Sequence, residues 1–124
     1  MIKGNGIDII EVERIKVNIE NKRFLNKYYT ENEVEYLETR KFNPQTAAGI
    51  FAAKEAVAKC LGTGFSNFGL SDIEILKDEN GKPFVNLFNN ALKRANEMKI
   101  TNIQLSISHV KEYAVASCIS EGIE

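Results

Sequence analysis

The pattern of apolar positions divides the 124-residue chain into a helical first half and a strand-rich second half. Residues 1–10 alternate between polar and apolar side chains and then become apolar, which predicts a strand. Residues 11–29 carry apolar side chains at helical spacing, with an interruption near residues 18–21. The chain is therefore expected to begin with a strand that leads directly into a broken helix.

Local signals predict the ends of the next two helices. Thr30 and Glu33 have the spacing of a capping box, in which each side chain satisfies a backbone N–H at the start of a helix. Asn43 is the expected N-cap of a longer helix, and Pro44 suits its first position because its missing N–H is not needed there. This alanine-rich helix should run to about Leu61.

The second half alternates between strands and turns. It contains expected strands at residues 73–76, 83–87, 103–109 and 113–119, a tight turn at Asn80-Gly81, and a helix at residues 90–98 with Ala91, Leu92 and Ala95 facing inward. Together the two halves predict an α+β fold, with the helices of the first half packed on a small, mainly antiparallel sheet. The length predicts a single domain that spans residues 1–124.

Composition narrows the function classes. The net charge is −1, so the overall field of the protein is not that of a nucleic-acid binder. No apolar run approaches the ~20 residues that a membrane span needs. Cys60 and Cys118 are far apart in sequence and fit small core residues in a reducing compartment, so a cytoplasmic protein is expected.

Charge is unevenly distributed along the first helical region. Residues 14–29 contain five basic residues and a single acidic one, Glu20. The basic residues are Arg14, Lys16, Lys22, Arg23 and Lys27. Such a run is most often a solvated helix face. In a protein of nearly zero net charge it is also a candidate docking surface for an acidic partner.

Two acids stand in unusual settings. Asp8 lies among isoleucines in the first strand, where it either points into a site or ends the strand and caps the next helix. Glu55 falls on the side of its helix that carries small apolar residues, one turn before Lys59. Glu55 and Lys59 either form an ordinary i,i+4 ion pair or belong to a functional site.

These residues suggest one kind of chemistry. Two carboxylates on separate rigid elements suit Mg²⁺, which binds one or two protein carboxylates together with waters and substrate phosphates. Lys59, the glycines that begin at Gly62, and His109 are placed to contact phosphate, although Gly62 alone is more typical of a helix C-cap. The combination favours phosphoryl-type transfer. A serine hydrolase is disfavoured because no nucleophile elbow surrounds Ser106 or Ser108.

Several motifs resemble those of the holo-acyl-carrier-protein synthases. Gly-Ile-Asp-Ile-Ile-Glu at residues 6–11, followed by Arg-Ile at 14–15, is similar to their N-terminal signature. Phe-Ala-Ala-Lys-Glu-Ala at residues 51–56, continuing to the glycine turn at 61–64, resembles their central motif. Gly-Lys-Pro at residues 81–83 and Ser-Ile-Ser-His at 106–109 resemble their third region, and the order and spacing agree along nearly the whole chain.

The resemblance implies a phosphopantetheinyl transferase of the short, trimeric bacterial type. Such enzymes move the 4′-phosphopantetheine arm of coenzyme A onto a serine of apo acyl carrier protein, releasing adenosine 3′,5′-bisphosphate, and a role in fatty-acid biosynthesis is expected. Nucleic acid and membrane are not expected partners.

The resemblance also implies roles for individual residues. Asp8 and Glu55 would ligate Mg²⁺, and Lys59 would contact phosphate and assist the leaving group. The further residues expected at coenzyme A are Gly62, Gly81, Lys82, Pro83, Ser108 and His109, while Arg14 would meet the carrier protein. Because the sites of this family lie between subunits, Asp8 and His109 are expected from one chain and Glu55 and Lys59 from its neighbour.

One position departs from the family pattern. The family usually has an arginine immediately before the Phe-Ala-Ala-Lys-Glu motif, whereas this chain has Ile50. Arg40 or Lys41 is the suggested replacement, and weaker coenzyme A binding is expected. Two other functions remain open: a non-catalytic module that binds coenzyme A or the carrier protein, and a Mg²⁺-dependent phosphohydrolase.

Overall fold

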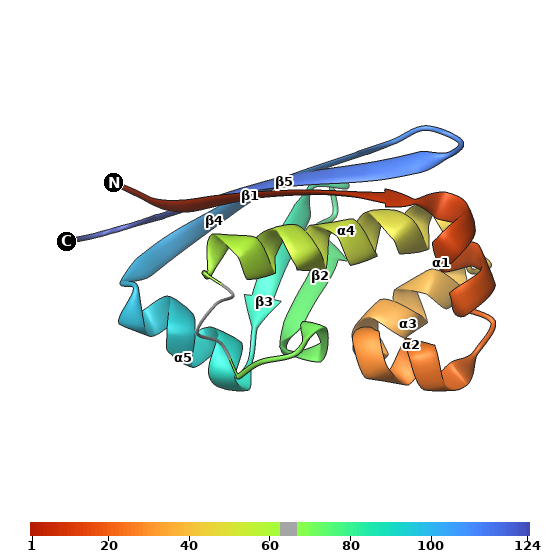
Figure 1. Cartoon of the computed structure of the whole chain (residues 1–124), viewed down its shortest axis with the longest axis horizontal. Coiled ribbons are helices and arrows are strands. Elements are labelled where there is room, and N and C mark those ends of the chain that lie inside the picture. Colours follow the sequence, from red (N-terminus) through yellow and green to blue (C-terminus); the bar gives the residue numbers. More distant parts are fainter. Residues whose placement is uncertain (63–66) are drawn as a thin grey trace.

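A long central helix packs beneath a three-stranded antiparallel sheet, as the α+β prediction requires (Figure 1). The computed structural model describes residues 1–62 and 67–124. The three-stranded sheet has the order β1-β5-β4, formed by β1 (Ile2–Glu11), β5 (Tyr113–Gly122) and β4 (Ile100–His109). A separate antiparallel hairpin contains β2 (Ile73–Lys77) and β3 (Pro83–Leu87), preceded by a short 3-10 turn, η2 (Leu70–Asp72).

The helices of the first half form as predicted. The expected break separates α1 (Val12–Asn18) from α2 (Lys22–Tyr28), and Asn21 caps the second of them through a hydrogen bond from the Arg23 N–H. The capping box of Thr30 and Glu33 opens α3 (Glu31–Thr39), and Asn43 caps α4 (Pro44–Cys60). The alternative role of Asp8 as a helix cap is wrong, because β1 continues through Glu11.

Two details of the second half differ from prediction. In α5 (Asn89–Glu97), Ala91 and Ala95 are buried as expected, but Leu92 is 45% exposed and lies beside an open groove rather than in the core. The turn between β2 and β3 is longer than a two-residue hairpin loop. The Asp78 carboxylate accepts hydrogen bonds from two backbone N–H groups of the loop, at Asn80 and Lys82, and this local bonding stabilises the longer turn.

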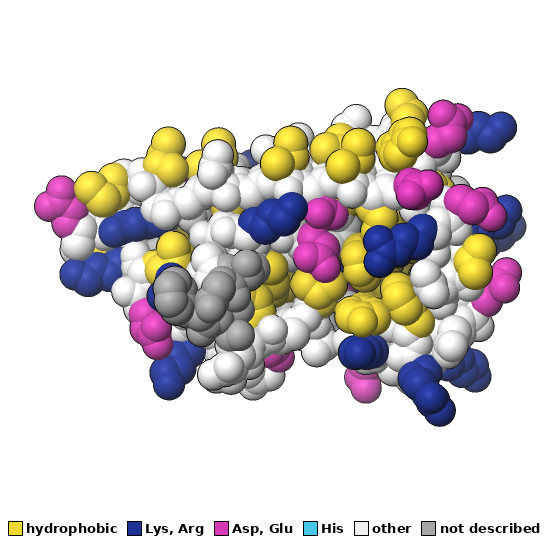
Figure 2. Space-filling model, viewed as in Figure 1, with side chains coloured by type: hydrophobic (Ala, Val, Ile, Leu, Met, Phe, Trp, Pro, Cys, Tyr) yellow, Lys and Arg dark blue, Asp and Glu magenta, His cyan; other side chains and the backbone are white. Residues whose placement is uncertain are grey.

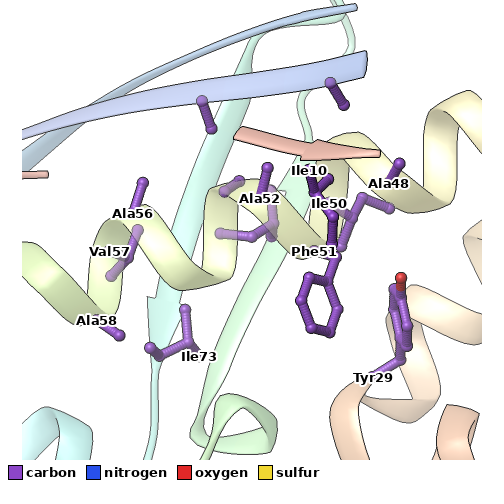
Figure 3. Packing of buried hydrophobic residues seen from close by; sticks show 14 of the residues in the cluster. Ile10, Tyr29, Ala48, Ile50, Phe51, Ala52, Ala56, Val57, Ala58 and Ile73 are labelled. Atoms are coloured by element: carbon purple, nitrogen blue, oxygen red, sulfur yellow. The ribbon is translucent and has the colours of Figure 1, made fainter. Parts of the chain in front are cut away.

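The core lies between α4 and the elements around it. Small residues of α4, such as Ala52 and Ala56, face the sheet, while Phe51 points toward Tyr29 and Ala58 lies near Ile73 (Figure 3). Short side chains on this face let the helix approach the strands closely. Cys60 and Cys118 are both buried and not disulfide-bonded, which confirms their predicted role as small core residues.

A buried ion pair ties α4 to α3 and β2. Lys54 donates a hydrogen bond to Glu33, and both side chains are fully inaccessible to solvent. Glu33 also accepts from the backbone N–H groups of Ile75 (2.7 Å) and Thr30 (2.8 Å). Burial raises the pKa of Glu33 and lowers that of Lys54, and their mutual attraction opposes both shifts. With its oxygens satisfied, this pair fixes the position of α4 in the fold.

The outer face of the three-stranded sheet carries exposed apolar side chains. On β1, Ile7 and Ile9 are 63% and 64% exposed, and Tyr113 and Ile119 of β5 are also exposed. Figure 2 shows hydrophobic side chains along the sheet at the top of the view. None of the helices in the described part of the chain is long and apolar enough to cross a membrane.

Candidate functional site

Close contact between β1 and α4 positions the first group of predicted site residues. A β-carbon at Gly6 would lie 2.1 Å from the carbonyl oxygen of Ala56, which only glycine avoids. A β-carbon at Gly4 would likewise lie 2.5 Å from the carbonyl oxygen of Cys60. The two glycines of the N-terminal motif therefore let the strand lie directly against the helix. Asp8, two residues beyond Gly6 and on the same side of the strand, is brought to α4 by this contact.

Asp8 and Lys59 meet at this crossing. The Lys59 ammonium donates hydrogen bonds to the Ile7 carbonyl oxygen (2.8 Å) and to the Asp8 carboxylate (3.3 Å). The two side chains are 49% and 19% exposed, so the pair lies at the surface. Within the described chain Lys59 pairs with Asp8 rather than with Glu55, so the suggested ordinary i,i+4 ion pair is not formed.

Glu55 lies beside this pair and is half-buried. Its pKa is raised, first by desolvation and then by the negative charge of Asp8, while Lys59 and Arg14 partly offset the shift. The two carboxylates are therefore close enough to repel each other. Repulsion of this kind is relieved by a cation, so the donor set fits Mg²⁺, which needs only one or two protein carboxylates.

A pocket of about 240 Å³ opens next to these groups. Asp8, Glu55 and Arg14 contribute its charged lining. The apolar lining comes from Ile9 and Ile10 of β1 and from three aromatic rings, those of Phe24, Tyr28 and Phe51. Figure 2 shows acidic and basic side chains over the middle of α4, with hydrophobic side chains beside them. The pocket thus combines a candidate cation site with an apolar wall and an exposed arginine.

His109 lies in a different place. It lines a small pocket of about 40 Å³ with Ile50 of α4, Lys77 of β2 and Ile107. Lys77 pairs with Pro83 across the hairpin, so the predicted residues Gly81, Lys82 and Pro83 follow around the adjoining turn. Gly81 adopts a φ of 81°, which glycine accommodates without strain. The second group of predicted residues therefore gathers around the end of the β2–β3 hairpin.

The two groups lie on opposite sides of α4. Asp8 is on β1, one edge strand of the sheet, and His109 is on β4, the other edge strand. The pockets around Glu55 and around His109 share no lining residue. The predicted placement of Asp8 and Lys59 in different chains is wrong, whereas the placement of His109 and Glu55 in different chains stays a prediction. Asp8 and Lys59 are in contact within a single chain, because the glycines of β1 bring the strand onto α4.

Two predicted residues lie apart from both pockets. Ser108 precedes His109 on β4, so its side chain is on the opposite, outer face of the sheet. Gly62 follows the C-cap of α4 with a φ of 72°, and its N–H donates to the Lys59 carbonyl oxygen. The rest of the predicted glycine turn, residues 63 and 64, is outside the described residues.

Sequence reasoning missed Lys77 and the aromatic wall. Lys77 is the last residue of β2, just before the turn. A lysine at such a position is usually solvent-exposed and without a function, so the local sequence does not indicate that it belongs to a site. Phe24 and Tyr28 have the i,i+4 spacing of ordinary core residues, although their rings lie 4.8 Å apart beside the Glu55 pocket.

Comparisons with known proteins agree with the motifs and with the fold. The chain is 55% identical to a holo-[acyl-carrier-protein] synthase of Clostridium botulinum over 99% of this chain and 100% of that one. A holo-(acyl-carrier-protein) synthase of Bacillus anthracis, solved in complex with CoA (3′,5′-ADP), superposes with a TM-score of 0.80 at 37% identity, over 99% of each chain. The enzyme of Helicobacter pylori, solved with coenzyme A, gives a TM-score of 0.81 at 28% identity over 94% of this chain and 99% of that one. Residues 4–118 match the sequence profile of one family, and the chain therefore belongs to the 4′-phosphopantetheinyl transferase superfamily.

Proposed function

We propose that this protein transfers the 4′-phosphopantetheine group of coenzyme A to a serine of apo acyl carrier protein. The products are holo acyl carrier protein and adenosine 3′,5′-bisphosphate, and fatty-acid biosynthesis is the expected pathway. The observation that carries the proposal is the meeting of Asp8, Glu55 and Lys59 between β1 and α4 in a chain of this family. Relatives that carry this activity in their names, and two that were solved with coenzyme A or its nucleotide portion, support it.

Asp8 and Glu55 would hold Mg²⁺, and their mutual repulsion supports that assignment. When bound, the ion would neutralise charge on the pyrophosphate of coenzyme A. Lys59 uses two of its three N–H donors on Ile7 and Asp8, which leaves one to contact a phosphate oxygen. That contact would stabilise the charge that develops on the departing bisphosphate.

The attacking oxygen belongs to the serine of the carrier protein. It forms a bond to the phosphorus of the phosphopantetheine arm while the bond from that phosphorus to the bisphosphate breaks, so the enzyme needs no nucleophile of its own. Arg14 lines the Glu55 pocket and is exposed, so it is suited to guide an acidic carrier protein toward the reacting groups.

A homotrimer with sites between subunits completes the proposal. Two features support it: the two groups of site residues lie on opposite sides of α4, and apolar side chains are exposed on the outer face of the sheet. A second copy that covers this face would bury Ile7 and Ile9. It would also bring the His109 side of one chain toward the Glu55 side of another.

Intact-mass spectrometry of apo acyl carrier protein tests the reaction. With enzyme, coenzyme A and Mg²⁺, the carrier should gain the mass of one phosphopantetheine arm. Asp8→Ala, Glu55→Ala and a chelator control should each prevent the gain, and a carrier that lacks its serine should stay unmodified. An unmodified carrier with the wild-type enzyme would overturn the proposal. Binding of the carrier that persists in chelator would then favour a docking module, and release of phosphate without a carrier would favour a phosphohydrolase.

A further inference from the structure

A second group of carboxylates lies on the side of α4 that is turned toward α3 and β2. Lys54 is inaccessible to solvent and is attracted by two buried carboxylates, Glu33 of α3 and Glu74 of β2. Glu74 is 3% exposed, and one of its oxygens accepts a hydrogen bond from the Thr30 hydroxyl (2.6 Å). Its other oxygen accepts from the Asn86 amide of β3 (3.2 Å). We call Lys54, Glu33 and Glu74 the buried charge cluster.

The buried charge cluster joins α4 rigidly to its neighbours. Glu33 binds the helix through Lys54 and the hairpin through the backbone N–H of Ile75. Glu74 adds contacts to the start of α3 and to β3. In residues 1–62 and 67–124, no buried side-chain nitrogen or oxygen lacks a hydrogen-bond partner. A fully bonded network of this kind holds its members in one arrangement.

Stability alone does not explain charges at this place. Burying them costs desolvation energy, and apolar residues of similar volume often stabilise a protein as well or better. A buried polar group can instead select one packing arrangement, because any other arrangement leaves it without a partner. The cluster therefore favours a single orientation of α4 about its own axis.

The opposite side of α4 does less to define that orientation. Gly49, Ala52 and Ala56 face the sheet, and such short side chains interlock with strands less firmly than larger ones (Figure 3). Glu55 directly follows Lys54, and successive helical residues point about 100° apart. The direction in which Lys54 is held thus also determines the direction in which Glu55 points.

We propose that Lys54, Glu33 and Glu74 are positioning residues that turn α4 so that Glu55 faces Asp8 and the two can bind one metal ion. The residues that line the Glu55 pocket include no member of the cluster, so the three act through Glu55 rather than on the ligand. The proposal rests on the proposed function, since it needs Asp8 and Glu55 as ligands of Mg²⁺. It adds that charges buried on the other side of the helix set the affinity for the ion.

Mn²⁺ binding by the full chain, followed by electron paramagnetic resonance without coenzyme A or carrier protein, tests this role. Lys54→Met/Glu33→Gln removes both charges of the ion pair at similar side-chain volume. It should bind Mn²⁺ about tenfold more weakly than wild type, the lower range for residues that orient metal ligands. Transfer should need about tenfold more Mg²⁺ for half-maximal rate, and saturating Mg²⁺ should restore most of kcat. Glu74→Gln keeps the ion pair and should lose affinity in the same direction, but less.

Val57→Ala separates positioning from stability. Val57 is buried on the same helix, so its truncation should lower the unfolding temperature while the cluster and the Mn²⁺ affinity stay as in wild type. Unchanged affinity in either cluster variant, or an equal loss in Val57→Ala, would overturn the positioning role and leave the transferase function intact. Wild-type binding no tighter than that of Glu55→Gln would instead overturn the metal site itself, and with it the metal's part in the proposed function.

Discussion

The two sides of α4 carry opposite chemistry. Toward β1 lie two carboxylates, Asp8 and Glu55, whose repulsion suits a bound cation. Toward β2 and β4 lie Lys77 and His109, with no carboxylate in the pocket they share, which suits a bound anion. One helix therefore presents a pair of carboxylates on one side and a pair of basic groups on the other. A ligand with a metal-bound pyrophosphate and a separate phosphate matches both, but a single chain does not present them on one face.

The Lys54–Glu33 pair fixes the position of α4, so breaking it should disturb both sides of the helix at once. Of the variants considered, its loss should have the largest effect on stability. Lys54→Met leaves Glu33 buried with an uncompensated charge, which should lower the free energy of unfolding by about 3–5 kcal/mol. Urea denaturation measures the loss. The Lys54→Met/Glu33→Gln double variant should lose less than the single variant, because the buried charge is also removed.

Lys59→Met is the matched control for stability. Lys59 is on the same helix and also pairs with a carboxylate, but the pair is at the surface, so the change should be below about 1 kcal/mol. Similar losses in Lys54→Met and Lys59→Met would contradict the contrast between a structural and a functional lysine.

Glu55→Gln should disable only the β1 side. It should lower kcat by about 10²–10³-fold, because the amide no longer provides the charge of a metal ligand. The raised pKa of Glu55 means that its ionisation opposes folding as pH rises through that pKa. The neutral amide removes this cost, so the unfolding temperature at neutral pH should be unchanged or slightly higher. A lower unfolding temperature would indicate a structural role instead.

Arg14→Ala should give the smallest effect. Because Arg14 is exposed, its loss should raise KM for the carrier protein about threefold to tenfold at low salt, and less at high salt, where screening already weakens the attraction. KM for coenzyme A should not change. Transfer kinetics at two ionic strengths measure the difference, with Lys93→Ala as control; a salt-independent loss would argue against electrostatic docking.

The sequence predicted the elements well because their signals are local. The capping box at Thr30, the N-cap at Asn43 and the alternation in β4 each depend on a few neighbouring residues. The sequence also singled out Asp8 and Glu55, since a carboxylate among isoleucines and another on an alanine-rich helix face are visible in it; the structure brings the two carboxylates close together, and their role as metal ligands stays a prediction.

Contacts between distant elements could not be predicted in the same way. Which residues share a side of α4 depends on the strand order β1-β5-β4, so Asp8 and Lys59 were wrongly placed in different chains. The burial of Glu33 depends on Lys54 and Ile75, which are distant in sequence, so the capping box alone indicated only a helix start. Leu92 has an inward helical spacing, yet the groove beside β3 and β4 leaves it exposed.

Subunit mixing tests most directly whether the two sides of α4 complete one site between chains. A Glu55→Gln chain and a His109→Ala/Lys77→Ala chain are each assayed alone, at coenzyme A well below KM, and then after unfolding and refolding together. The account predicts that each is weakly active alone and that the mixture regains activity, because some sites combine an intact Glu55 side with an intact His109 side. A mixture that forms mixed oligomers by native mass spectrometry, yet is no more active than the sum of its parts, would contradict the shared site.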